Sequence, residues 1–417
     1  MIQNKLFYRI LLLLIFLFFL FVKVNKNNSD NNETLKDNNN YINDNIKDNI
    51  NDNINDNIND DNVNDIDNDN VDINNNFNDI NNNYIHNNFV YNKKVNGYYS
   101  YYNKTYKYKN KMNIVPVSFS ADNNYIYPLI VLLTSILFNS SPNTFYSFHI
   151  LVPNDFLEIN KKKVFGLAKK YPKCEVTIHN LGDKYLYWSV YGNYTQTVYY
   201  RLSLSDIIKD LDKIIYLDCD TMVHKDLLEL YNIKMGDKYY MGFPGHEIGY
   251  IEIQGTRNFI NSGVMLVNLK LLREVKAPIK YEEYYNIYGT QKVDEYLINN
   301  IFYDKIKFLP LKFGIPDFEE GHHIIGSPSV FYYSLNNSLN QTEEEMINSS
   351  NNRIVTHGAY KEQKWWSREY ETLSDIGKKW IFYASKSNVF NDICKTFPQY
   401  RLICKKLMTE RNIHKLY

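Results

Sequence analysis

The sequence has few cysteines, and their spacing excludes a common kind of metal site. Four occur among 417 residues, and none of them follows the C-x-x-C spacing typical of zinc sites. A structural zinc centre is therefore not expected. Cys394 and Cys404 could form a disulfide if this part of the chain lies in an oxidising compartment, and two free thiols are the alternative.

The chain also lacks net charge and a basic stripe. Lys and Arg balance Asp and Glu at 47 each, and no run of basic residues with interleaved aromatics stands out, so no nucleic acid partner is expected. The balance hides an asymmetry, since residues 30–92 hold 14 acidic residues against two lysines, and residues 93–417 carry a net charge of about +8. A mildly basic domain suits an anionic ligand such as a nucleotide diphosphate.

No cleavage motif of small residues follows the apolar run near the N-terminus. Ile10–Val22 holds 13 consecutive apolar residues, with Lys5 and Arg9 before it. This pattern favours a cytoplasmic tail and an uncleaved signal anchor over residues 1–24, with the positive end cytoplasmic. We therefore expect a single-pass type II protein of the Golgi or endoplasmic reticulum membrane, with its globular part lumenal. A cleaved signal peptide is the alternative.

Residues 25–111 are rich in Asn and Asp and are expected to form a disordered stalk. Their isolated Ile residues are too sparse to offset the entropy lost on ordering the backbone. The globular domain is expected over residues 112–370, followed by a basic helical extension over residues 371–417.

Strands and helices are expected to alternate along the globular part. Short runs rich in β-branched and aromatic residues indicate strands. The expected strands cover residues 113–119, 145–152, 174–179, 214–217, 238–243, 263–269 and 353–356, and the expected helices cover residues 125–138, 155–171, 197–208, 226–231, 271–274 and 293–302. This alternation favours an α/β fold with a mostly parallel central sheet flanked by helices.

The stretch Lys213–Val223 contains the strongest candidate for chemistry. Its apolar run ends in Asp218-Cys219-Asp220, and residues two apart on an extended chain point the same way. Two carboxylates at the end of a buried strand suit Mg²⁺ or Mn²⁺ better than Zn²⁺. Ligands bind at such strand ends in open α/β sheets. The alternative is that Asp220 caps the next turn and Asp218 is a solvated strand end.

A second candidate site follows the first expected strand. Small and polar residues between Ser118 and Tyr125 stand at the end of the strand and before a helix, which is typical of a nucleotide pocket. Asp122 could hydrogen-bond a base or ribose, and Tyr125 could stack on the base. The alternative makes Asp122 a helix N-cap and Tyr125 a first-turn packing residue.

Three segments, in this order, resemble the family 8 retaining glycosyltransferases, which include glycogenin-like enzymes and lipopolysaccharide galactosyl- or glucosyltransferases. They read SADNNYIYPLIVLLTSIL from residue 120, YYRLSLSDIIKDLDKIIYLDCDTMV from residue 199 and FINSGVMLVNLKLL from residue 259. The resemblance covers roughly residues 113–366. It implies a GT-A fold, a single nucleotide-sugar-binding α/β domain that uses Mn²⁺ and a UDP-sugar.

Carried over residue by residue, the resemblance implies a donor site. Asp218 and Asp220 would hold Mn²⁺, or Mg²⁺, against the diphosphate of the UDP-sugar. Arg201 and the turn Asn261-Ser262-Gly263 would contact the donor. The positions that match the family's uridine-binding segment are Ala121, Asp122, Asn124 and Tyr125.

Two motifs depart from the family's pattern, and the first is acidic. Where the family has Asp-Gln-Asp-x-x-Asn, residues 294–299 read Asp-Glu-Tyr-Leu-Ile-Asn. The resemblance implies that Asp294 binds sugar hydroxyls and that Glu295 lies near the reacting face. A glutamate there could be the nucleophile of a retaining reaction, and a solvated helix turn is the alternative.

The second departure lies in the motif His-x-x-Gly-x-x-Lys-Pro-Trp. His357 and Trp365 keep its spacing, while the glycine is displaced, the proline is missing and Lys364 comes one position late. We expect His357 to be the third metal ligand and Lys364 to contact the diphosphate, with Lys361 as the alternative for the second role.

The resemblance implies transfer of a hexose, glucose or galactose, from a UDP-sugar to a glycan, glycoprotein or glycolipid acceptor, with retention at the anomeric carbon. The alternative is a catalytically inactive, membrane-anchored GT-A-like binding or scaffold protein, which the altered histidine motif favours. A self-priming transferase resembling glycogenin is a third reading, and the expected lumenal location argues against it.

Overall fold

The structure is a computed structural model that describes residues 89–95, 98–103, 112–190, 192, 194–244, 259–289, 293–316, 343–358 and 364–413. The expected signal anchor, most of the expected stalk and Lys361 lie outside the described residues. Within the described part, no helix combines the length and the apolar character needed to cross a membrane.

In the described part of the chain, nine strands form one sheet in the order β1-β2-β5-β4-β3-β6-β9-β8-β10. Along this spatial order, the strands β5, β4, β3, β6, β8 and β10 all run in one direction. β9 lies between β6 and β8 and is antiparallel to both. The prediction of an α/β fold with a mostly parallel central sheet is therefore confirmed. The strands are β1 (Phe89–Val95), β2 (Tyr98–Asn103), β3 (Asn113–Ser120), β4 (Thr144–Val152), β5 (Cys174–Asn180), β6 (Lys213–Leu217), β8 (Tyr240–Pro244), β9 (Ile260–Asn268) and β10 (Ile306–Phe308).

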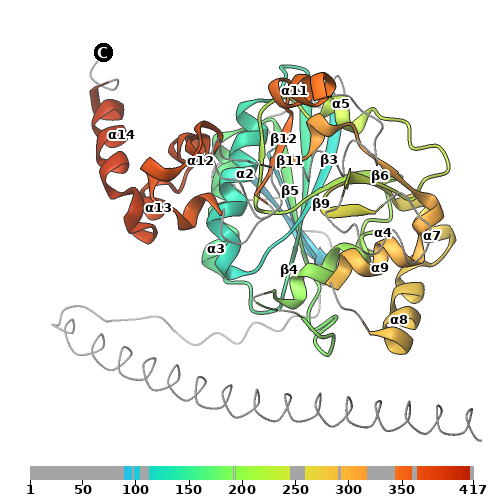
Figure 1. Ribbon diagram of the computed structural model, residues 1–417. Helices are drawn as coiled ribbons and strands as arrows, with labels where there is room; N and C mark the ends of the chain where they lie inside the picture. Colours follow the sequence, from blue (N-terminus) through green and yellow to red (C-terminus); the bar gives the residue numbers. More distant parts are fainter. Residues whose placement is uncertain are drawn as a thin grey trace, which may run out of the picture. The chain divides into compact units, whose positions relative to one another are not determined.

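Two hydrophobic clusters cover the two faces of this sheet, because successive side chains of a strand point to opposite faces. On β6, Ile215 and Leu217 belong to one cluster, and Ile214 and Tyr216 belong to the other. Helices lie on both sides (Figure 1). The first cluster includes α2 (Ile126–Phe138) and α3 (Glu158–Lys170), and the second includes η3 (Gln196–Ser203), α4 (Leu204–Ile207), α7 (Leu269–Glu274), α8 (Ala277–Tyr288) and α9 (Val293–Ile301).

β1 and β2 fall inside the range that we expect to be a disordered stalk. They pair with each other, and β2 pairs antiparallel with β5, so they form one edge of the sheet. For these residues the structure has paired strands instead of a disordered chain. The rest of the range from 25 to 111 lies outside the described residues.

A second, smaller sheet brings a distant segment to the end of β6. β7 (Thr221–Val223) comes shortly after β6 and pairs antiparallel with β12 (Val355–His357), so that Thr221 lies opposite His357. β11 (Ile315–Pro316) pairs in parallel with the other side of β12. The register of β7 and β12 therefore fixes the histidine beside the turn that holds Asp218 and Asp220.

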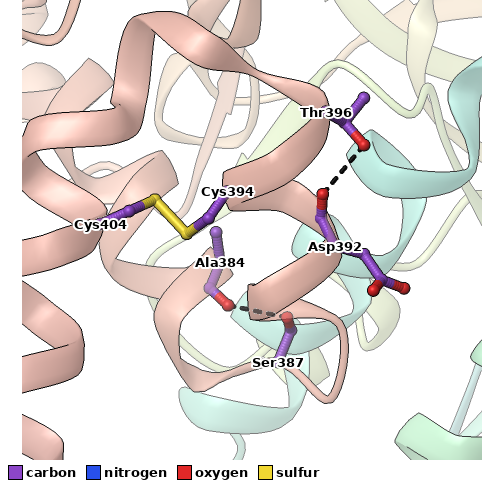
Figure 2. Close-up of a disulfide and its surroundings, with 6 residues drawn as sticks. All are labelled: Ala384, Ser387, Asp392, Cys394, Thr396 and Cys404. Atoms are coloured by element: carbon purple, nitrogen blue, oxygen red, sulfur yellow. Dashed lines mark hydrogen bonds between the residues drawn. A yellow bond between two sulfur atoms is a disulfide. The ribbon is translucent and has the colours of Figure 1, made fainter.

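The C-terminal part of the described chain is helical. Its helices are α12 (Asp375–Lys386), α13 (Phe390–Thr396) and α14 (Arg401–Ile413), and α12 packs on α2. A disulfide joins Cys394 of α13 to Cys404 of α14 (Figure 2). Of the two alternatives for these cysteines, the structure therefore has the disulfide. Cys174 and Cys219 are buried free thiols.

Apolar patterns mislead at two places in the chain. A helix is expected over residues 197–208, and none is expected where α8 lies. The first is mainly the 3₁₀ helix η3, followed by one turn of α4. In α8, the buried residues are Ala277, Pro278 and Tyr281, which is too sparse a set to give a clear helical stripe. A pattern of apolar residues also carries no information about the direction of a strand. The antiparallel direction of β9 therefore could not be predicted, because pairing with β6 and β8 determines it.

Candidate metal and donor site

The two aspartates after β6 and the histidine of β12 converge. One carboxylate oxygen each of Asp218 and Asp220 and one imidazole nitrogen of His357 lie within 4.8 Å of one another. His357 Nε2 is 3.3 Å from Asp220 Oδ1 and 3.9 Å from Asp218 Oδ2. The fold thus brings together the three residues that we expect as metal ligands. Two carboxylates and an imidazole are a suitable donor set for Mn²⁺.

Gly263 leaves room for this cluster. It lies in β9, and its carbonyl accepts the amide of Asp218 at 2.8 Å. A Cβ atom added to Gly263 would lie 2.2 Å from His357 Cε1 and 2.7 Å from Asp218 Oδ2. His357 and Asp218 therefore fill the place beside Gly263, and no side chain would fit at this position. The donor set of the cluster fits a divalent cation.

Lys364 supplies the cationic partner of Asp220. Its ammonium contacts Asp220 Oδ2 and donates to the carbonyl of Gly358 at 2.7 Å. Burial alone would raise the pKa of Asp220, but Lys364 and His357 more than offset that effect and hold the pKa below its ordinary range. Asp220 is therefore a charged carboxylate in a buried place, and positive charge keeps it so. The expected contact of Lys364 with a diphosphate stays a prediction.

Arg201 bridges the metal ligands and the acidic motif of α9. Its Nη2 lies 2.8 Å from Asp218 Oδ1, and its Nε lies 3.1 Å from Asp294 Oδ2. Nη1 donates to the carbonyl of Ser262 at 2.7 Å. The side chain is 4% exposed, and a charge buried so deeply needs such partners. Its expected contact with the donor stays a prediction.

Tyr216 is a site residue that sequence reasoning missed. Its hydroxyl donates to Asp218 Oδ1 at 3.0 Å, and its ring centroid lies 4.4 Å from the guanidinium carbon of Arg201. Asp218 Oδ1 thus accepts two donors, which leaves Oδ2 facing His357. A signal was available in the sequence, because Tyr216 and Asp218 are two residues apart and share one face of the chain.

Asn261, Ser262 and Gly263, which we expect to form a turn, lie in strand β9, and the first two hold Glu295 in place. Glu295 Oε2 accepts from the Asn261 side-chain amide at 3.0 Å and from the Ser262 backbone amide at 3.2 Å. One turn later in α9, the Asn299 side chain bonds both the amide and the carbonyl of Ile260 at 2.8 Å. The carboxylate is therefore anchored to β9, which differs from the alternative of a solvated helix turn.

Asp294 is almost fully buried, with 1% of its surface exposed. Burial raises the pKa of Asp294 to about 6, and the nearby Arg201 guanidinium acts in the opposite direction. This carboxyl therefore changes charge close to neutral pH.

The expected uridine segment begins as a helix cap. Asp122 Oδ1 accepts the backbone amides of Asn124 at 2.9 Å and of Tyr125 at 3.1 Å, so the capping alternative is correct for this oxygen. Ala121 is buried, and Tyr125 is 37% exposed with its ring edge-on to Trp366 at 5.9 Å. The uridine contacts of these residues stay predictions.

Comparison with protein families gives a match to the glycosyl transferase family 8 over residues 116–315. The chain is 28% identical over 220 residues to a putative glycosyltransferase of Haemophilus influenzae, covering 48% of this chain and 62% of that protein. It is 24% identical over 270 residues to glycosyltransferase GlyB of Streptococcus pneumoniae, covering 64% of each. The chain therefore spans slightly less than two thirds of these two relatives. A lipopolysaccharide 1,2-glucosyltransferase of Escherichia coli is 26% identical over 216 residues, covering 47% of this chain and 61% of that protein.

Solved structures give a likeness in fold. The galactosyltransferase LgtC in complex with donor and acceptor sugar analogues matches with a TM-score of 0.53 at 20% identity, covering 66% of this chain and 96% of that chain. The bifunctional glycosyltransferase WbbM matches with a TM-score of 0.53 at 18% identity, covering 68% of this chain and 51% of that chain. Residues 116–315 thus match glycosyltransferase family 8, and the mostly parallel sheet and the likeness to these solved structures show that the chain has the GT-A fold.

Proposed function

We propose that this protein is a retaining glycosyltransferase that moves a hexose from a UDP-sugar to a glycan, glycoprotein or glycolipid acceptor. The observation that carries the proposal is the meeting of Asp218, Asp220 and His357 beside Gly263. The family match supports a nucleotide-sugar donor. The proposed hexose is glucose or galactose, as the family resemblance implies.

The proposed leaving-group side of the site consists of the acidic pair, the histidine and the lysine. A divalent cation, Mn²⁺ or Mg²⁺, held by Asp218, Asp220 and His357 would stabilise the negative charge of the departing diphosphate as a Lewis acid. The Lys364 ammonium lies at the same carboxylate and would donate to phosphate oxygens. With its charge neutralised in this way, the leaving group needs no proton.

The proposed sugar side of the site consists of two carboxylates in different settings. Asp294, paired with Arg201, would accept hydrogen bonds from sugar hydroxyls. Glu295, held by Asn261 and Ser262, would attack the anomeric carbon, so that a glycosyl ester forms as the bond to UDP breaks. The acceptor hydroxyl would then displace the carboxylate and pass its proton to a phosphate oxygen of the UDP released in the first step. Two inversions at the same carbon give net retention.

The competing reading is an inactive GT-A-like binding protein, and it rests on the altered histidine motif. His357 and Lys364 nevertheless both reach Asp220. This arrangement supports an active enzyme, because both groups lie at the carboxylate that we propose as a metal ligand.

Replacing Asp220 tests the metal assignment. Asp220→Asn removes one charge from the proposed ligand set, and we expect turnover of the UDP-sugar to fall roughly 10²- to 10³-fold. Mn²⁺-dependent release of UDP measures the effect. Asp237→Asn is the control, because Asp237 is an exposed partner of Lys305. Full activity of Asp220→Asn would refute the metal assignment.

Glu295→Gln tests the nucleophile. Glutamine keeps an oxygen that accepts from Asn261 and Ser262, so the start of β9 should keep its shape. We expect kcat to fall by ~10³-fold or more, with little change in KM for the donor, because the attacking carboxylate is lost. Unchanged turnover would rule out an essential carboxylate at position 295 and favour a retaining reaction without a protein nucleophile.

The raised pKa of Asp294 predicts a pH dependence. Below pH 6 the carboxyl is increasingly protonated and loses its charge toward Arg201, and above pH 6 it is charged and accepts hydrogen bonds. The value of kcat/KM for the donor should therefore rise with pH through about 6 and level off above it. In Asp294→Asn, activity should be lower and this acidic limb should disappear. An unchanged limb in that variant would assign it to another group.

We also propose that residues 1–24 anchor the protein in the Golgi or endoplasmic reticulum membrane, with the described domain lumenal. The apolar run Ile10–Val22 supports an anchor, and the disulfide suits an oxidising compartment. After alkaline carbonate extraction of cells, the full chain should stay with the membrane pellet, and a variant without residues 1–24 should not. Recovery of the full chain in the supernatant would contradict the anchor.

A further inference from the structure

The disulfide between Cys394 and Cys404 closes a loop (Figure 2). This loop contacts the segment that carries Lys364. Inside this loop lies the 3₁₀ helix η9 (Pro398–Tyr400). The Gln399 side-chain amide donates to the backbone carbonyl of Trp366, and the Tyr400 hydroxyl donates to the backbone carbonyl of Trp365. Two neighbouring carbonyls are thus held by two neighbouring side chains of the loop.

The contact lies inside apolar packing. Tyr400 is 0% exposed and Trp365 is 1% exposed. The ring of Trp380, from α12, lies 5.7 Å from the ring of Tyr400 and 5.8 Å from that of Phe397, which also belongs to the loop. A buried hydrogen bond of this kind costs more to lose than one at the surface, because water does not take the place of the lost hydroxyl.

The same backbone carries two groups of the donor site. Lys364 is the cap residue of η7 (Trp365–Ser367), and its ammonium contacts Asp220 and Gly358. The ring of Trp366 lies against Tyr125, in the expected uridine segment. The places of the ammonium and of this ring therefore depend on the backbone at residues 365 and 366, which the loop holds.

We propose that the disulfide-closed loop, residues 394–404, is a positioning element of the donor site. It holds Trp365 and Trp366 so that the Lys364 ammonium lies where it binds the diphosphate of a nucleotide. This inference rests on the proposed function, which supplies the nucleoside diphosphate as ligand. It makes the affinity for that ligand depend on Tyr400 and on the oxidised state of Cys394 and Cys404, although none of the three touches the ligand.

Two ligands separate this role from a general loss of structure. Lys364 contacts Asp220, so it competes with a cation for that carboxylate. A displaced ammonium should therefore weaken diphosphate binding without weakening the binding of Mn²⁺ alone. A loosened fold would weaken both.

Tyr400→Phe is the main test, because it removes the hydroxyl and keeps the ring. The dissociation constant of UDP in the presence of Mn²⁺ should rise about 3- to 10-fold, as expected for one lost hydrogen bond. The dissociation constant of Mn²⁺ alone, measured by electron paramagnetic resonance, should stay the same or fall. Tyr383→Phe is the matched control, since Tyr383 is a buried tyrosine of α12 whose hydroxyl accepts from Asn139 at 2.8 Å, and both constants should stay unchanged.

Further variants test the path through Lys364. The double change Cys394→Ser with Cys404→Ser, and the reduced wild-type protein, should weaken UDP binding without weakening Mn²⁺ binding. In a Lys364→Ala background, Tyr400→Phe should add no further loss, because the two changes act on one interaction. Melting curves show that each variant is folded, and Gln399→Ala replaces Tyr400→Phe if the latter is not.

Three outcomes would overturn the inference. The first is a folded Tyr400→Phe protein that binds UDP with wild-type affinity. The second is a Tyr400→Phe protein in which the binding of UDP and the binding of Mn²⁺ are weakened equally. The third is a Tyr400→Phe change that weakens UDP binding as much in the Lys364→Ala background as in the wild-type protein. Failure of the wild-type protein to bind UDP with Mn²⁺ would count against the proposed function instead.

Discussion

The guanidinium of Arg201 lies between two carboxylates, and the candidate site depends on it. Asp218 and Asp294 both lie within hydrogen-bonding distance of this buried group. Without it, two acidic side chains would face each other in a region of low dielectric, where burial and mutual repulsion both oppose ionisation. Because the carbonyl of Ser262 also accepts from the guanidinium, one side chain connects η3, the end of β6, the start of β9 and α9.

Strand direction explains why these elements meet at one edge of the sheet. β3 and β6 are parallel neighbours, so the segments that follow them emerge at the same edge, where ligands bind in such sheets. β9 runs antiparallel to β6, with Leu217 opposite Val264, so the beginning of β9 lies at this edge. The reversal of a single strand thus places Asn261, Ser262 and Gly263 beside Asp218.

The parts of the fold and of the candidate site that could be predicted are those in which a residue's role produces a recognisable pattern in the nearby sequence. The parallel half of the sheet and the Asp218–Asp220 pair could be predicted, because buried strands and the residues that end them have a recognisable pattern. His357 has no such pattern on a three-residue strand and was found through the family resemblance alone. The contact between Tyr400 and Trp365 is purely tertiary, since neither periodicity nor motif spacing connects the two residues.

The altered histidine motif shows how a site tolerates a change in spacing. Here the glycine directly follows His357, and both of its backbone groups are used, since the amide of Gly358 donates to the carbonyl of Asp220 at 2.8 Å and its own carbonyl accepts from Lys364. A Cβ atom at Gly358 would lie 3.2 Å from that Asp220 carbonyl, so the approach is close. The lysine comes one position late, yet its ammonium still reaches Asp220, because its backbone is fixed from the C-terminal side. His357 and Lys364 therefore meet at Asp220 although the spacing between them differs from the family's pattern.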